Sequence, residues 1–158
     1  VATIEELREL KQRLIVDVKI AGDEVLRKAK DPFAIDLTDA IDVLMLKVSP
    51  LGGLQRALQL AVHHRLPTVV SSALESVVGL SYGLQLAARL PQLNYACGLA
   101  TNSLFVEDLG ALPIVDGAMR LGAYGIEPER LQRFKVSPER LEWWRNRIKE
   151  IWQLREAQ

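Results

Sequence analysis

The sequence predicts an α/β fold in which four strand–helix units form half of a (β/α)8 barrel. Apolar, strand-like segments alternate with helical patterns over most of the chain, which is typical of parallel sheets with helical crossovers. The predicted strands end at Asp23, Lys47, Ser71 and Gly98, at intervals of 24 to 27 residues. Each strand ends in polar residues or glycine, as barrel strands do at the end that carries the active site. A complete barrel takes roughly 200 residues or more, so four units make half of one.

The first unit begins with a helix capped by Thr3, and acidic residues follow the strand of this unit. One face of this helix is apolar, with Ile4, Leu7, Leu10 and Leu14. A strand is predicted over residues 15–21, and Gly22, Asp23 and Glu24 follow it. A weaker helical pattern covers residues 31–39, with a proline in its first turn.

The second unit contains the most informative segment, residues 42–53. It predicts a short apolar strand that ends at Lys47, then a turn, and then Gly52 and Gly53 at the start of a helix. Burial of an unpaired ammonium group is costly or lowers its pKa. The sequence therefore leaves two alternatives, a lysine that extends to solvent at the strand end or a catalytic lysine at the mouth of a barrel.

Two further strands and one long helix complete the alternation, at residues 68–70, 95–97 and 74–90. Ser72 and Glu75 have the spacing of a capping box at the start of that helix, whose amide groups could also bind a substrate carboxylate. After Asp108, residues 112–121 predict a turn-rich excursion, and a final helix begins near Ser137.

Composition limits the classes of partner. The chain has a formal net charge of zero and no basic stripe, which argues against nucleic acid or an anionic membrane as the main partner. No apolar run approaches the roughly 18 residues of a membrane-spanning helix, and no signal-peptide pattern is present. Cys97 is the single cysteine, so no internal disulfide can form and we expect a cytoplasmic location.

Asp23 and Lys47 form the constellation that matters for chemistry, because they end neighbouring predicted strands at one end of the barrel. A carboxylate there suits a hard cation such as Mg²⁺, although Asp23 could instead cap the segment that follows it. A metal ion and a lysine together stabilise an enolate formed next to a carboxylate. His63 and His64 lie at the end of an outer helix, away from the strand ends, and are not expected to bind ligands.

Four sequence runs resemble motifs of the enolase superfamily. Residues 20–24 (Ile-Ala-Gly-Asp-Glu) are similar to the strand that carries its third metal ligand. Residues 46–53 (Leu-Lys-Val-Ser-Pro-Leu-Gly-Gly) are similar to its sixth-strand lysine motif. Residues 71–76 and 96–101 resemble strands seven and eight of the actinobacterial o-succinylbenzoate synthase family. The resemblance extends over nearly the whole chain.

This resemblance implies a Mg²⁺-dependent dehydration in menaquinone biosynthesis, which converts 2-succinyl-6-hydroxy-2,4-cyclohexadiene-1-carboxylate to o-succinylbenzoate. It implies that Asp23 is a magnesium ligand and that Lys47 is the cation facing the enolate. Glu24 is implied to lie next to the metal ligands without binding the metal itself. The residues implied to line the substrate pocket are Ser71, Ser72 and Gly98. Ala100 stands where relatives usually have glycine, which affects the expected fit of the substrate.

The resemblance also implies parts that this sequence does not contain. The family's base belongs to a Lys-x-Lys motif, which the sequence Lys28-Ala29-Lys30 does not match, and its first two metal ligands lie on earlier strands. We therefore expect residues 1–110 to form strands five to eight of the barrel and residues 111–158 to return to the barrel and a capping domain. The expected partners are the N-terminal half of the same enzyme and a small carboxylate substrate, and the chain alone should be inactive.

Two alternatives remain open from the sequence. An N-acylamino acid racemase or dipeptide epimerase on the same scaffold would also use Lys47. A non-catalytic half-barrel that pairs with itself would close its own sheet edges without using a metal.

Overall fold

The computed structural model describes residues 3–122 and 124–156. The chain divides into two compact units, residues 1–125 and 126–158. The first unit holds all the predicted strand–helix repeats. The division at residue 110 into a barrel half and an extension stays a prediction.

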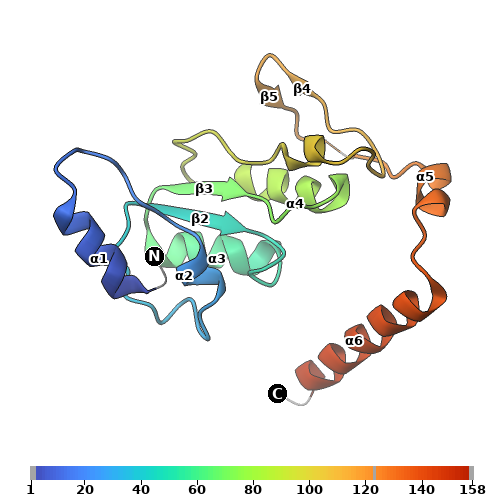
Figure 1. The fold of residues 1–158 in the computed structure, drawn as a ribbon, viewed down its shortest axis with the longest axis horizontal. Coiled ribbons are helices and arrows are strands. Elements are labelled where there is room, and N and C mark those ends of the chain that lie inside the picture. The colour runs from blue at the N-terminus through green and yellow to red at the C-terminus, as the bar shows by residue number, and fades with distance from the viewer. Residues whose placement is uncertain (1–2, 123, 157–158) are drawn as a thin grey trace. The chain divides into compact units, whose positions relative to one another are not determined.

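The first unit is built on a three-stranded parallel sheet with the order β1-β2-β3. Figure 1 shows β2 and β3 side by side. The strands are β1 (Ala21–Gly22), β2 (Val43–Lys47) and β3 (Thr68–Ser71). The register pairs Gly22 with Leu44, and Lys47 with Ser71. The connections contain α2 (Glu24–Arg27) and α3 (Leu54–His64), and α4 (Val77–Ala87) follows β3. The predicted α/β alternation is therefore confirmed in this unit.

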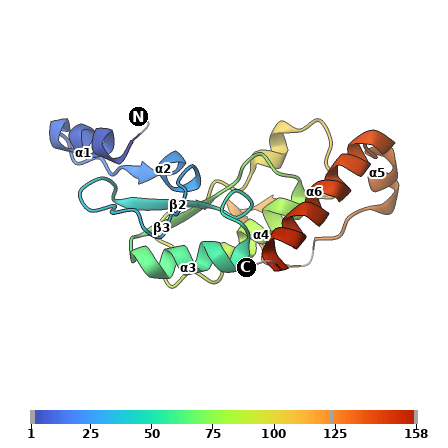
Figure 2. The ribbon, with the colours of Figure 1, turned by 90° about the horizontal axis from the view of Figure 1, so that it is seen from below.

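One face of the sheet is covered by helices, and Figure 2 shows α3 along it. Leu44, Leu46 and Val70 are fully buried on this face. They belong to the same apolar cluster as Leu60 of α3 and Leu80 of α4. Because side chains alternate along a strand, Lys47 and its register partner Ser71 lie on the opposite face. The strand ends thus direct polar groups away from the helical layer.

The predicted strand over residues 15–21 is wrong except at its end, because pairing begins only at Ala21. β2 starts at Val43, so no residue of β2 lies opposite residues 15–19. Just before the ladder, the carboxylate of Asp42 accepts a hydrogen bond of 2.9 Å from the backbone N–H of Ile20. Ile15 is 98% exposed, so the apolar pattern there does not reflect burial within this unit.

The predicted helix over residues 31–39 is also wrong, and the chain forms turns there. Asp31 accepts a 3.0 Å hydrogen bond from the backbone N–H of Phe33, and Asp36 accepts one of 3.0 Å from Thr38. Such side-chain bonds to an amide two residues on compete with helical hydrogen bonding. Asp39 has a φ of 57°, which ends any helical continuation.

The helix predicted over residues 74–90 begins later, at Val77, because Leu74 adopts a left-handed conformation with a φ of 61°. The capping box expected from Ser72 and Glu75 does not form, since both side chains bind other groups. Asp108 caps the helix instead, and its Oδ2 accepts a 2.7 Å hydrogen bond from Val77 N–H.

The fourth predicted strand, at residues 95–97, is reduced to a single parallel bridge between Ser71 and Gly98. Gly98 N–H donates to the carbonyl of Val70 at 2.9 Å. The bridge still places Gly98 beside β3, in the order that the predicted repeats require.

Several other elements match the sequence patterns. The helix α1 (Ile4–Arg13) has the expected cap, a reciprocal pair of bonds between Thr3 and Glu6. The turn-rich excursion predicted over residues 112–121 is a hairpin of β4 (Ile114–Val115) and β5 (Ala118–Met119). A short 3-10 helix, η1 (Thr101–Leu104), precedes it and was not predicted. Asp116 and Gly117 both have positive φ, as the tight turn of this hairpin requires.

The second unit contains α5 (Pro128–Arg133), which the sequence did not predict, and the predicted final helix, α6 (Pro138–Glu156). Ser137 Oγ accepts a 3.2 Å hydrogen bond from Arg140 N–H and so caps α6. Arg140 lies over the ring of Trp143 at 4.3 Å, and Trp143 packs edge-on against Trp144.

Within residues 3–122 and 124–156, no helix combines the length and apolar character that crossing a bilayer requires.

Candidate functional site

The site lies at the carboxyl ends of β1 and β2. Asp23 directly follows β1, and Lys47 is the last residue of β2. Lys47 Nζ donates a 2.6 Å hydrogen bond to Asp23 Oδ2, and the two side chains are only 17% and 19% exposed. The alternative in which this lysine extends into solvent is therefore wrong. Its ammonium group is held by a carboxylate, which offsets the cost of burial.

Asp23 does not act as a helix cap. It occupies the position before α2, but its side chain makes no cap hydrogen bond within the described part of the chain. One of its oxygens binds Lys47, and the other lies 4.0 Å from Arg27 Nε. The capping alternative for Asp23 is wrong, and its carboxylate faces the lysine.

Arg27 belongs to this site and was missed in the sequence. Its guanidinium donates a 2.8 Å hydrogen bond to Glu24 Oε1. This bond, more than the charge of Arg27, holds the pKa of Glu24 below its usual value. The spacings from Glu24 and Asp23 to Arg27, three and four residues, are those of paired helical side chains and could have identified it. Glu24 is thus bound by Arg27, beside the ion pair.

Ser71 and Gly98 come together next to the lysine strand. Ser71 is the register partner of Lys47, and Gly98 bridges to Ser71 from the other side. A Cβ atom at Gly98 would lie 3.0 Å from Ser71 Oγ, so a side chain at this position would crowd the Ser71 hydroxyl. These two residues therefore line the same end of the sheet as the ion pair.

Ser72 is engaged differently. It is 6% exposed, and its Oγ lies 2.6 Å from Thr101 Oγ1. This bond connects the end of β3 to η1. Thr101 belongs to the run 96–101 named above, but nothing in the sequence indicates that it pairs with Ser72.

One carboxylate of the site, Asp23, suits a hard divalent cation, which requires about six oxygen ligands. In the part of the chain that the structure describes, no group of three or more His, Cys, Asp or Glu residues could hold a metal ion. The role of Asp23 as a magnesium ligand stays a prediction. The Nε2 atoms of His63 and His64 lie 2.9 Å from the carbonyl oxygens of Phe33 and Pro32, which gives these histidines a structural role.

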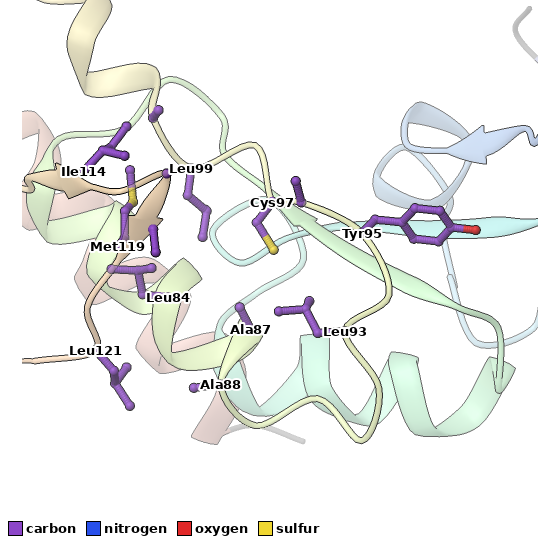
Figure 3. A pocket seen from close by; sticks show the side chains of 14 residues that line it. Leu84, Ala87, Ala88, Leu93, Tyr95, Cys97, Leu99, Ile114, Met119 and Leu121 are labelled. Carbon is purple, nitrogen blue, oxygen red and sulfur yellow. The ribbon is translucent and has the colours of Figure 1, made fainter.

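A cavity of about 380 Å³ lies elsewhere in the first unit, between α4, the segment before Gly98 and the β4–β5 hairpin (Figure 3). Leu84, Leu99 and Met119 point into it, and none of its lining residues is charged. Neither Asp23 nor Lys47 lines this cavity. It is an apolar space that lacks the groups of the strand-end site.

The fold resembles known barrel enzymes. The N-succinyl Arg/Lys racemase from Bacillus cereus superimposes with a TM-score of 0.71 over 85% of this chain and 38% of the racemase, at 23% identity. The muconate lactonizing enzyme from Pseudomonas putida superimposes with a TM-score of 0.67 over 82% of this chain and 38% of that enzyme, at 22% identity. At these identities the likeness shows the fold alone, and it confirms the predicted fold class.

Curated relatives are more similar in sequence. The o-succinylbenzoate synthase of Mycobacterium ulcerans is 48% identical over 155 residues, and that of Mycobacterium tuberculosis H37Rv is 47% identical. These alignments include 97% of this chain but 46% and 47% of the two synthases. The chain thus spans about half the length of the curated relatives it matches.

A family model supplies the assignment for the chain itself. The model described as "Enolase C-terminal domain-like" matches residues 1–130, which is well over half of the sequence. The match includes both residues of the ion pair and every strand of the parallel sheet. The chain therefore belongs to the enolase C-terminal domain-like family.

Proposed function

We propose that this chain supplies the C-terminal half of an o-succinylbenzoate synthase, a lyase that dehydrates 2-succinyl-6-hydroxy-2,4-cyclohexadiene-1-carboxylate. The observation that carries the proposal is the contact of 2.6 Å between Lys47 Nζ and Asp23 Oδ2, at the carboxyl ends of neighbouring parallel strands. The identity of 47–48% to synthases of this name supports the same substrate class. In this proposal the reaction takes place in the cytoplasm.

The chemistry requires loss of the proton next to the substrate carboxylate and departure of the ring hydroxyl as water, which leaves an aromatic ring. The base that removes the proton is contributed by the other half of the barrel. Lys47 remains an ammonium group and stabilises the negative charge that develops on the enolate oxygen. Asp23 orients this ammonium group before substrate binds, so the positive charge is in place when it is needed.

In this proposal Asp23 is also one ligand of a divalent cation, Mg²⁺, and the remaining ligands come from the other half of the barrel. When bound, the cation supplies positive charge at the substrate carboxylate. Arg27 holds Glu24 and lies near the outer oxygen of Asp23. Its role is to keep both carboxylates on the strand-end side of α2.

Ser71 and Gly98 line the substrate pocket in this proposal, and Ser72 supports it from the buried side through Thr101. A hydroxyl group at Ser71 can donate to a carboxylate or carbonyl of the substrate succinyl group. The absence of a side chain at Gly98 leaves room for the Ser71 hydroxyl beside it.

The test is a dehydration assay with the complete barrel, formed from this chain and the N-terminal half. Formation of o-succinylbenzoate is followed by its ultraviolet absorbance, with and without Mg²⁺. Dehydration that depends on Mg²⁺ and on Lys47 supports the proposal. Racemisation of N-acylated amino acids without dehydration would replace it with the racemase alternative.

A further inference from the structure

Beyond Lys47 and Ser71, the two central strands separate into loops, and a second contact joins these loops. The parallel register of β2 and β3 ends at the pair Lys47 and Ser71. Ser49, two residues after Lys47, donates a hydrogen bond from its hydroxyl to Glu75 Oε1. The other oxygen of Glu75 accepts a 3.2 Å hydrogen bond from the backbone N–H of Ala73. Glu75 therefore binds both loops at once.

The carboxylate of Glu75 is not used as a helix cap. The first helical amide of α4, at Val77, donates to Asp108 at 2.7 Å. Ser76 precedes the helix and makes no cap bond through its side chain in the part of the molecule that the structure describes. The bond to Ser49 is thus a distinct contact between the loops.

The helix is built to accommodate Glu75. Gly79 lies one turn on, and a Cβ atom there would be 2.7 Å from Glu75 Cβ and 3.0 Å from Glu75 Oε1. Any side chain at position 79 would therefore displace the glutamate. Glycine at this position leaves the space that the Ser49–Glu75 contact needs.

We propose that Glu75 is a positioning residue that fixes the distance between the loop after Lys47 and the loop after Ser71. The proposal rests on the proposed function, because these two loops border the site in which the substrate would lie. Glu75 acts through Ser49 and Ala73 and does not touch the reacting atoms. Its loss widens the pocket and weakens substrate binding, while the Lys47–Asp23 pair stays in place because it is held by β1 and β2.

The test uses the complete barrel and compares Glu75→Ala, Ser49→Ala, the double variant and the conservative variant Glu75→Gln. We expect KM to rise about 10-fold in each alanine variant, with kcat within about 3-fold of the wild type. The double variant should be no worse than either single variant, because both remove the same contact. Glu75→Gln keeps one oxygen that can accept from Ala73 N–H, and its new amide group can donate to Ser49 Oγ, so this variant should restore KM. Glu9→Ala on α1, which removes an exposed carboxylate, is the matched control.

Three results with these variants would overturn the proposal. A loss of kcat in Glu75→Gln as large as in Glu75→Ala would make Glu75 an acid or base. A lower melting temperature with unchanged KM would leave it a purely structural role. Additive effects on KM in the double variant would show that Ser49 and Glu75 act independently and not through a shared contact.

Hydrogen exchange provides a readout that is independent of the proposed reaction. We expect faster exchange in residues 72–76 of Ser49→Ala than in the wild type, because Glu75, which accepts from Ala73 N–H, is no longer held by Ser49. Unchanged exchange there would contradict the bridge. A wild-type barrel that does not dehydrate the substrate would overturn the proposed function, while the exchange result would still decide whether Glu75 joins the loops.

Discussion

Lys47 and Asp23 form a largely buried ion pair, with Lys47 Nζ 2.6 Å from Asp23 Oδ2. The two residues are 24 positions apart in sequence and meet because β1 and β2 are parallel neighbours. Pairing offsets the free-energy cost of burying each charge on its own. The pair places a fixed positive and a fixed negative group at one end of the sheet.

Asp23 should contribute to metal affinity. In the complete barrel, Asp23→Asn is expected to lower Mg²⁺ affinity at least about 10-fold, because an amide is a weaker ligand than a carboxylate. Isothermal titration calorimetry measures the change. Glu5→Gln on α1, which alters an exposed carboxylate, is the control and should keep the affinity. Unchanged affinity in Asp23→Asn would remove Asp23 from the metal site.

Arg27 should determine the titration of Glu24. The hydrogen bond from Arg27 is the main cause of the lowered pKa of Glu24. Arg27→Gln should therefore raise the pKa of Glu24 toward its ordinary value, which a carboxyl-detected NMR titration can follow. Arg13→Gln, which removes a guanidinium paired with Glu9 on α1, should leave the pKa of Glu24 where it is. If the pKa of Glu24 stays low in Arg27→Gln, another group holds it.

Asp42 should stabilise the start of β2. Its carboxylate accepts a hydrogen bond from Ile20 N–H and binds Lys11 Nζ at 2.8 Å. Asp42→Ala should lower the free energy of unfolding by about 1–3 kcal/mol at pH 7, measured by urea denaturation. Asp17→Ala removes an exposed carboxylate bound to Lys19 and should change stability much less.

The contribution of Asp42 should depend on pH. The hydrogen bond from Ile20 and, after it, the bond from Lys11 lower the pKa of Asp42 in the folded chain. Since the unfolded value is about 3.9, the stabilisation is fully present above that pH and is lost as the pH falls through the folded pKa. The difference in stability between wild type and Asp42→Ala should therefore shrink below about pH 4. A difference that grows on acidification would contradict this assignment.

A side chain at Gly98 should disturb Ser71. A Cβ atom at this position would approach Ser71 Oγ to 3.0 Å, so Gly98→Ala is expected to displace Ser71 and raise KM in the complete barrel. Steady-state kinetics measure the effect. Gly122→Ala is the control, because no atom lies within 4 Å of the added Cβ there. A KM equal to that of the wild type would show that Ser71 adjusts without consequence.

The sequence predicted the parts of the fold in which local pattern and burial agree. Residues 43–47 are apolar up to the lysine and form β2, and the helix after Gly53 follows as expected. Residues 15–19 (Ile-Val-Asp-Val-Lys) include three apolar residues that suggest a strand, but no residue of β2 lies opposite them. An apolar pattern predicts a strand only where a neighbouring strand can pair with it.

Side-chain partners far apart in sequence account for the other differences. Asp108 caps α4 from 31 residues away, so Ser72 and Glu75 are available for Thr101 and Ser49. A capping box is inferred from spacing alone, and spacing does not reveal a competing distant donor or acceptor. The lysine and aspartate could be predicted because the repeat placed them at equivalent strand ends. Arg27 was overlooked because no helix was predicted over residues 24–27, so its spacing from Asp23 and Glu24 was not recognised as a helical pairing.

The most direct test of the central proposal is the dehydration rate of the complete barrel with Lys47→Ala and Lys47→Arg. We predict that Lys47→Ala lowers kcat by about 100-fold or more, because the enolate loses its cation. Lys47→Arg keeps the charge and should retain more activity than the alanine variant. Circular dichroism and Mg²⁺ affinity of each variant confirm that the barrel remains folded. A kcat for Lys47→Ala equal to that of the wild type, in a folded and metal-bound barrel, would contradict the account.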